Sequence, residues 1–150
     1  MSILNQIIQT KKNEIELNKK VNSISDLEKF DEFSRVPNSL SKSLLTSNYG
    51  IIAEHKRKSP SKSIINKISS VKETVVGYQN AGASGISILT DQTYFGGSSK
   101  DLIKARKNTY LPILRKEFII DEYQIIESKA LGADAILLIA TCLSKEMIKK

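Results

Sequence analysis

The sequence predicts an α/β fold of the (β/α)8 TIM-barrel class, with its first four βα units following an N-terminal helical extension. Four short apolar runs, each long enough for a buried parallel strand, lie at residues 50–54, 85–90, 112–116 and 134–139. Helix-like stretches lie between them, at about 64–81, 99–107 and 122–131. This alternation predicts a parallel sheet built from βα units. Repeated helix-to-strand turns, without a glycine-rich dinucleotide fingerprint after any strand, favour a barrel over a Rossmann fold.

The region 1–48 is predicted to form the N-terminal helical extension. Isoleucines among lysine, glutamate and asparagine over residues 2 to about 20 are typical of an amphipathic helix. A second, short helix is expected to begin at Ser25, because Ser25 and Glu28 have the spacing of a capping box. The serine-rich stretch from Ser39 to Ser47 predicts a loop that leads into the first strand.

The region 49–150 is predicted to be the first half of the barrel. Glycine follows the first and third of the helix-like stretches between the strands, at Gly82 and Gly132, where a helix C-terminus favours it. Ser144 is expected to cap a helix after the fourth strand, and the sequence stops at Lys150, within that helix. Four βα units make half of an eight-stranded barrel, so we expect half of an active site.

Composition restricts the possible partners. The chain has 150 residues with 40% apolar and 26% charged residues, and no run of eighteen apolar residues that would predict a membrane span. Its net charge of +7 is spread over scattered lysines, and the one dense basic cluster, at 55–58, has no interleaved aromatic residues. A small anionic ligand is therefore expected rather than a nucleic acid. The single cysteine, Cys142, and the N-terminal sequence favour a cytoplasmic protein.

The expected catalytic groups are Glu54, Lys56 and Lys116. Glu54 and Lys56 lie two positions apart where the first strand ends, so both side chains point to the same face. Lys116 ends the third strand. Side chains from alternate strands share a layer inside a barrel, and active sites lie at the C-terminal ends of the strands. We therefore expect these three groups to converge in the barrel mouth.

Apolar side chains are expected to complete a pocket beside the charged groups. Phe118 lies two residues beyond Lys116, and Leu137 lies in the fourth strand. The loop after the second strand carries Tyr94 and Phe95 next to two glycines, which favours an aromatic wall against a ligand over simple loop packing.

Two lysines that face one cavity repel each other, which favours proton loss from one of them and makes it usable as a general acid. Glu54 acts in the opposite direction and is expected to hold Lys56 charged for anion binding. The alternative is that both lysines are solvated side chains at the start of loops.

The remaining polar candidates have simpler interpretations. His55 is the only histidine, and the strand alternation points it outward toward the helices. No second histidine or cysteine is near enough to predict a metal site. Cys142 is expected to be a buried apolar thiol. Ser59 and Ser61 lack triad partners, so ligand hydrogen bonding or turn formation is expected there.

Four segments together resemble the indole-3-glycerol-phosphate synthase family. They are Ile52-Ala-Glu-His-Lys-Arg-Lys-Ser-Pro-Ser61, Ser87-Ile-Leu-Thr-Asp-Gln-Thr-Tyr-Phe-Gly-Gly-Ser98, Pro112-Ile-Leu-Arg-Lys-Glu-Phe-Ile-Ile-Asp121 and Gly132-Ala-Asp-Ala-Ile-Leu-Leu-Ile139. The resemblance runs in order over the whole chain. It implies a barrel without metal or other cofactor that acts in tryptophan biosynthesis. The implied reaction converts 1-(2-carboxyphenylamino)-1-deoxyribulose 5-phosphate into indole-3-glycerol phosphate, with release of carbon dioxide and water.

The resemblance also implies roles for individual residues. Lys116 matches the general acid of ring closure, Lys56 matches the lysine that binds the anionic groups of the substrate, and Glu54 matches the glutamate that orients them. The substrate-binding positions that it implies are Ser59, Pro60, Ser61, Phe95, Phe118 and Leu137.

Length is the main departure from the family, because its members are about twice as long as a half-barrel. The phosphate-binding loops after strands seven and eight are absent from the sequence, so the 150 residues alone are expected to be inactive. Phosphoribosylanthranilate isomerase, a related phosphate-sugar barrel, is disfavoured by the Glu-x-Lys and Arg-Lys-x-Phe motifs. A non-catalytic half-barrel that self-associates through its open sheet edges is the alternative to an enzyme.

Overall fold

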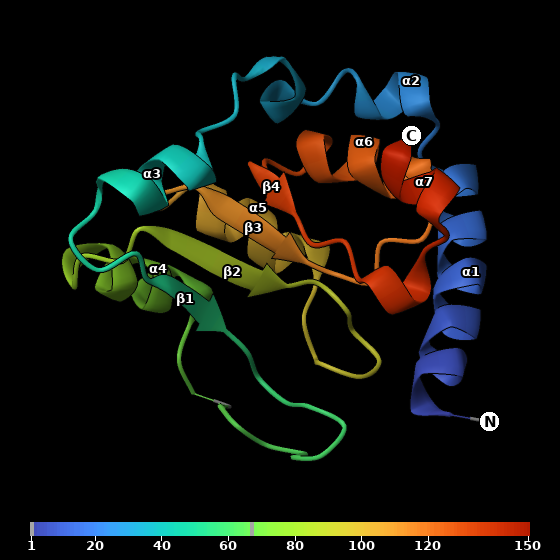
Figure 1. The fold of residues 1–150 in the computed structure, drawn as a ribbon, viewed down its shortest axis with the longest axis horizontal. Helices are drawn as coiled ribbons and strands as arrows, with labels where there is room; N and C mark the ends of the chain where they lie inside the picture. Colours follow the sequence, from blue (N-terminus) through green and yellow to red (C-terminus); the bar gives the residue numbers. More distant parts are fainter. Residues whose placement is uncertain (1, 67) are drawn as a thin grey trace.

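Four parallel strands form a single sheet in the computed structural model, which describes residues 2–66 and 68–150 (Figure 1). The strands are β1 (Ile52–His55), β2 (Gly85–Leu89), β3 (Ile113–Lys116) and β4 (Ala135–Ile136). Their spatial order is β1-β2-β3-β4, so each strand pairs with the next strand in the chain. This order lacks the reversal of a doubly wound sheet and confirms the predicted barrel-type arrangement.

A helix follows each of the first three strands. These helices are α4 (Val71–Asn80), α5 (Ser99–Arg106) and α6 (Glu122–Ala130). Side chains of Ser70, Ser98 and Asp121 accept backbone N–H bonds at their N-termini, which explains where each helix begins. Beyond β4 the chain forms a short 3-10 helix, η2 (Ala140–Cys142), and then α7 (Lys145–Lys149), which is capped by Ser144 as predicted.

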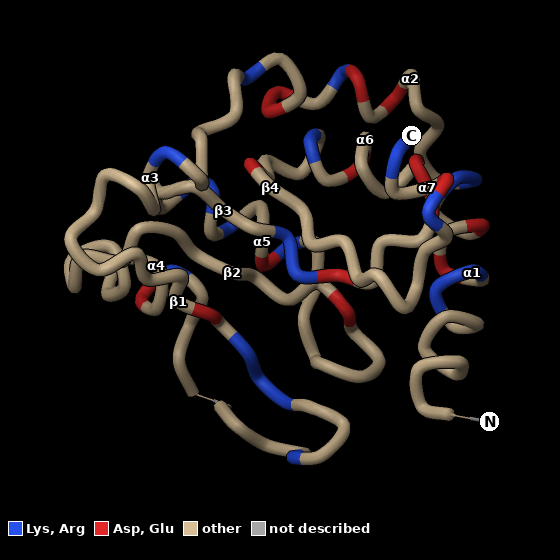
Figure 2. The backbone as a smooth tube through the Cα atoms, in the orientation of Figure 1, with Lys and Arg blue, Asp and Glu red and all other residues tan. Residues whose placement is uncertain are grey.

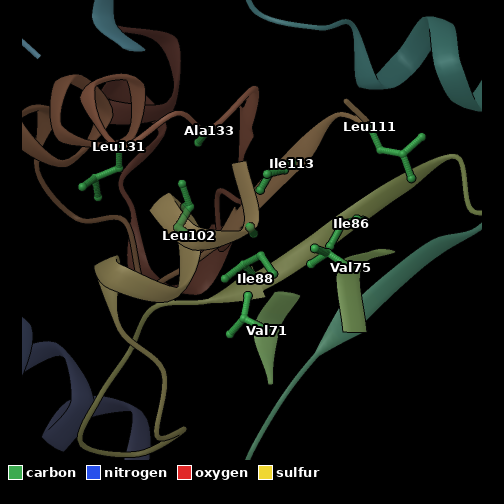
Figure 3. Packing of buried hydrophobic residues seen from close by; sticks show 10 residues of the cluster. Val71, Val75, Ile86, Ile88, Leu102, Leu111, Ile113, Leu131 and Ala133 are labelled. Carbon is green, nitrogen blue, oxygen red and sulfur yellow. The ribbon is translucent and has the colours of Figure 1, made fainter. Parts of the chain in front are cut away.

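The main hydrophobic core lies between the sheet and the helices α4 and α5 (Figure 3). Ile86 and Ile88 of β2 and Ile113 of β3 are completely buried there. They pack against Val75 of α4 and Leu102 of α5, which are also completely buried. Strand residues of the opposite parity, such as Ser87 on β2 and Lys116 on β3, therefore face the other side of the sheet, where the interior of the barrel lies.

In the described residues before β1 the chain forms four helical segments. They are α1 (Ile3–Val21), α2 (Ile24–Leu27), the 3-10 helix η1 (Asp31–Ser34) and α3 (Leu40–Thr46). The helix α1 confirms the prediction for residues 2–20, and in Figure 1 it stands on the side toward which the strand arrows point. Ile15 of α1 joins a second core cluster with Leu27 of α2 and Tyr123 of α6.

Two predictions for this N-terminal region were wrong. The capping box of α2 is formed by Ser23 and Asp26, so this helix begins two residues earlier than predicted. The expected loop from Ser39 to Ser47 contains α3, whose first turn is capped by the Ser39 side chain. Serine at the start of a segment is a helix signal when its hydroxyl can reach the N–H three residues later, which the compositional argument overlooked.

Other boundaries also differ from the prediction. The helix expected from residue 64 begins only at Val71, and residue 67 lies outside the described residues. The fourth strand was expected over 134–139, but its pairing with β3 covers only Ala135 and Ile136. The predicted glycine turns are confirmed, because Gly82 and Gly132 have positive φ angles of 85° and 93°.

Asp134 connects the N-terminal segments to the sheet. Its completely buried side chain is 2.7 Å from both Arg35 Nη1 and Arg106 Nη1. It also accepts the backbone N–H groups of Ile113 and Asn38, at 2.8 and 2.7 Å. This hub lies at the N-terminal ends of the strands, the side of a barrel that serves stability. Among residues 2–66 and 68–150, none of the helices combines the length and apolar character of a membrane span.

Candidate active site

Three charged side chains meet at the C-terminal ends of β1 and β3. The Lys56 ammonium lies 2.8 Å from Glu54 Oε1, and the Lys116 ammonium lies 3.4 Å from Glu54 Oε2. Figure 2 shows acidic and basic stretches of the backbone where β1 and β3 end. The predicted convergence of Glu54, Lys56 and Lys116 is therefore confirmed, and their catalytic roles stay a prediction.

The register of the sheet explains this arrangement. Glu54 pairs with Ser87 across β1 and β2, and Leu89 pairs with Lys116 across β2 and β3. All four side chains therefore belong to the same face of the sheet. The Ser87 hydroxyl donates a hydrogen bond of 3.0 Å to Glu54 Oε2. Ser87 was missed by sequence reasoning, although its position on the inward face of the second strand could have identified it.

Glu54 is held in its ionised form. Burial acts to raise its pKa, but the hydrogen bonds from Lys56 and Ser87 and the charge of Lys116 outweigh burial and lower the pKa below its ordinary value. The three groups together carry one net positive charge, which favours an anionic ligand at the mouth of the site.

A small, largely apolar cavity adjoins the charged groups. It is lined by Lys56, Leu89, Asp91, Phe95, Lys116, Glu117, Phe118, Leu137 and Ile139. The rings of Phe95 and Phe118 are tilted by 40° to each other, with centroids 6.1 Å apart. The structure therefore brings the predicted residues Phe95, Phe118 and Leu137 together with both lysines, in a space suited to an aromatic ring.

A buried ion cluster lies directly behind this cavity. The ammonium of Lys11, which is 3% exposed, is 2.7 Å from Asp91 Oδ2, 3.3 Å from Glu117 Oε1 and 2.5 Å from Glu14 Oε2. Sequence reasoning missed this cluster. Ile7, Lys11 and Ile15 are spaced four residues apart, and both isoleucines are buried. A lysine inside the buried stripe of an amphipathic helix was the signal that could have found it.

The Ser59-Pro60-Ser61 segment lies outside the cavity. The Ser59 N–H donates to the carbonyl of Lys62 at 2.8 Å, and the hydroxyls of Ser59 and Ser61 are 3.2 Å apart. Pro60 and Ser61 are exposed. These contacts are those of a tight turn, as one of the two interpretations expected, and a contribution of the three residues to substrate binding stays a prediction.

Tyr94 does not share the wall formed by Phe95, so the prediction of an aromatic pair facing the ligand was wrong for this residue. Its hydroxyl lies 3.0 Å from the Thr10 hydroxyl on α1. Successive residues of the loop point in different directions because the Asp91 carboxylate accepts both of their N–H groups and bends the backbone into a turn.

His55 lies where the sequence predicted, whereas Cys142 was expected to be buried and is less buried than that. His55 is 3% exposed on the helix-facing side of β1, and burial together with the charge of Arg57 lowers its pKa. Cys142 is partly buried, and burial raises the pKa of its thiol. Within the described part of the chain, no group of three or more histidine, cysteine, aspartate or glutamate side chains is arranged to hold a metal ion.

Comparison with known proteins identifies one family. A family model for indole-3-glycerol phosphate synthase matches residues 4–150. An indole-3-glycerol phosphate synthase of Bacteroides thetaiotaomicron is 48% identical over 146 residues, which are 96% of this chain and 55% of that protein. Those of Prochlorococcus marinus strain MIT 9215 and Leptospira interrogans are 45% and 44% identical, over 97% and 98% of this chain and 50% and 55% of their own lengths. The chain thus spans about half the length of the curated relatives it matches.

Proposed function

The chain belongs to the indole-3-glycerol phosphate synthase family, and we propose that the protein containing it closes the indole ring in tryptophan biosynthesis. The substrate is 1-(2-carboxyphenylamino)-1-deoxyribulose 5-phosphate, a phosphorylated small molecule. The products are indole-3-glycerol phosphate, carbon dioxide and water. The observation that carries the proposal is that Glu54 bridges Lys56 and Lys116 beside the cavity lined by Phe95 and Phe118.

Lys116 is the proposed general acid. Ring closure joins the carboxylate-bearing carbon of the aromatic ring to the ketone carbon of the sugar chain, and the ketone oxygen becomes an alcohol. The Lys116 ammonium supplies the proton for that oxygen, and loss of carbon dioxide followed by loss of water completes the indole. Its position on the cavity wall, 3.4 Å from Glu54, supports this role because a proton donor must lie next to the reacting atoms.

Lys56 and Glu54 have the proposed supporting roles. Lys56 also lines the cavity, where its charge can bind the substrate carboxylate while the aromatic ring lies against the phenylalanine side chains. Glu54 contacts both ammonium groups and so keeps them oriented before the substrate binds. The three residues act as a preorganised set in this scheme.

The test uses the full-length protein and the replacement Lys116→Met. Indole-3-glycerol phosphate is measured by its absorbance, and carbon dioxide is measured separately. We expect kcat to fall by about 100-fold or more, as removal of a general acid requires. Lys104→Met is the matched control, because Lys104 is exposed on α5 and its kcat should stay within about twofold of wild type.

Three outcomes would contradict the proposal. A wild-type protein that does not consume the substrate refutes the reaction, and a Lys116→Met variant with wild-type kcat refutes the assigned acid. Isomerisation of phosphoribosylanthranilate without release of carbon dioxide would instead favour the isomerase alternative.

Self-association through the sheet edges is the proposed alternative for these 150 residues by themselves. Within the described residues β1 and β4 are the outer strands of the sheet, and Ile52 on β1 is 40% exposed. Sedimentation as a concentration-independent monomer would contradict this alternative. A cytoplasmic location is also proposed, since a single cysteine in the sequence suits a reducing compartment.

A further inference from the structure

The lysine of the buried ion cluster comes from α1, outside the sheet that carries the proposed catalytic groups. Its ammonium lies between Asp91, at the end of β2, and Glu117, at the end of β3. Asp91 is 1% exposed and Glu117 is 5% exposed, so neither carboxylate can rely on water to balance its charge. Lys11 is therefore the cation that pairs with both buried carboxylates.

Each of these carboxylates holds the backbone of one cavity phenylalanine. Asp91 Oδ1 accepts the N–H of Phe95 at 3.0 Å, and Glu117 Oε1 accepts the N–H of Phe118 at 2.9 Å. Glu117 Oε2 also accepts a hydrogen bond of 2.8 Å from the Thr90 hydroxyl. This bond is a second connection between the ends of β2 and β3, besides the one through Lys11. The positions of both phenylalanines thus depend on where the two carboxylates lie.

We propose that Lys11 is a positioning residue that sets the spacing of Phe95 and Phe118 and so controls affinity for the aromatic half of the substrate. This inference rests on the proposed function. Lys11 does not line the cavity, so it acts only through Asp91 and Glu117. Through Lys11, α1 contributes to ligand selection as well as to packing.

The Lys11 side chain stays positively charged near neutral pH. Burial acts to lower its pKa, but the carboxylates of Glu117, Asp91 and Glu14 outweigh burial and raise the pKa above its ordinary value. The positive charge that Lys11 places in the buried ion cluster therefore does not change with pH near neutrality.

The test compares two halves of the substrate as separate probes of the full-length protein. Anthranilate represents the aromatic half, and glycerol 3-phosphate represents the phosphate half. Their Kd values are measured by titration for wild type, Lys11→Met and Lys11→Arg. Lys19→Met is the matched control, because Lys19 also lies on α1 and makes a surface ion pair of 2.9 Å with Asp121, away from the cavity.

Lys11→Met should raise the Kd of anthranilate at least about tenfold, since displacements near 1 Å are costly to aligned contacts. The Kd of glycerol 3-phosphate should stay within about twofold of wild type in the same variant. Lys11→Arg keeps the charge in a wider, planar group and should raise the anthranilate Kd by about threefold. Lys19→Met should change neither value.

A folded Lys11→Met protein with an unchanged ratio of the two Kd values would overturn the inference. If that variant does not fold, as judged by circular dichroism, the same comparison is made with Lys11→Arg. An unchanged ratio of the two Kd values in Lys11→Arg would then overturn the inference. Wild-type turnover of the complete substrate tests the proposed function separately, so its failure is distinguishable from an unchanged Kd ratio.

Discussion

Replacement of Gly97 by alanine should disturb the loop that carries Phe95. A Cβ atom on Gly97 would lie 2.0 Å from the carbonyl oxygen of Leu89 and 2.6 Å from its carbonyl carbon. Ordinary contact begins near 3.4 Å, so the loop and the end of β2 must separate by about 1.4 Å. Both are backbone segments, and β2 is paired on both sides, so the loop is the part that moves.

Phe95 lies two residues before Gly97 and moves with it. A shift of about 1 Å in a group that positions a substrate can cost about 100-fold in rate, so kcat/KM should fall by about that factor, or about 2.7 kcal/mol of transition-state stabilisation. The free energy of unfolding should fall by about 1–3 kcal/mol, as for other overpacked sites.

Steady-state kinetics of the full-length protein and urea unfolding measure both effects. Gly77→Ala is the matched control, because Gly77 lies inside α4 and an added Cβ meets no atom within 4 Å. That replacement should stabilise the protein by about 0.5–1 kcal/mol and leave kcat/KM unchanged. A Gly97→Ala variant with kcat/KM within about threefold of wild type would refute the reasoning.

Three further predictions concern other parts of the molecule. Because the folded pKa of Glu54 lies below its ordinary value of 4.5, its charge stabilises the fold above pH 4.5, and this contribution is lost as the pH falls through the lower folded value. The unfolding free energy of wild type relative to Glu54→Gln should therefore be largest near pH 7 and shrink below pH 4.5; a difference independent of pH in urea titrations would contradict this. Asp134→Ala leaves the buried Arg106 without its carboxylate partner and should cost about 3–5 kcal/mol in urea unfolding, whereas a loss below about 1 kcal/mol would argue against the hub. Tyr94→Phe removes only the contact with Thr10, so stability should fall by about 1 kcal/mol while KM stays at its wild-type value; a raised KM would restore Tyr94 to the ligand wall.

Local patterns were sufficient to predict much of the candidate site. Alternation along β1 placed Glu54 and Lys56 on one face, and the rule that alternate strands share a layer brought in Lys116. The same reasoning placed His55 on the helix side. These predictions succeeded because side-chain direction in a parallel sheet is a property of the backbone, which short apolar runs reveal.

Predictions failed where polar residues had two physically reasonable uses. The serines of the 39–47 segment are compatible with a loop and also with the cap and exposed face of α3. The Tyr94 side chain could have faced the cavity or contacted Thr10, and the backbone turn around Asp91 directs it to Thr10. In both places the deciding contact involves atoms that composition does not specify.

The sequence by itself therefore determined the order of the four strands and of the helices between them, the face on which the site residues of the strands lie, and the family. Periodicity and capping involve residues a few positions apart, so they can be recognised in the sequence alone. Only the tertiary structure decided that Lys11 of α1 lies between Asp91 and Glu117, which are far from it in the sequence. Burial of that charge is favourable only when both carboxylates are close to it, and such closeness is created by the packing of α1 against the ends of the strands.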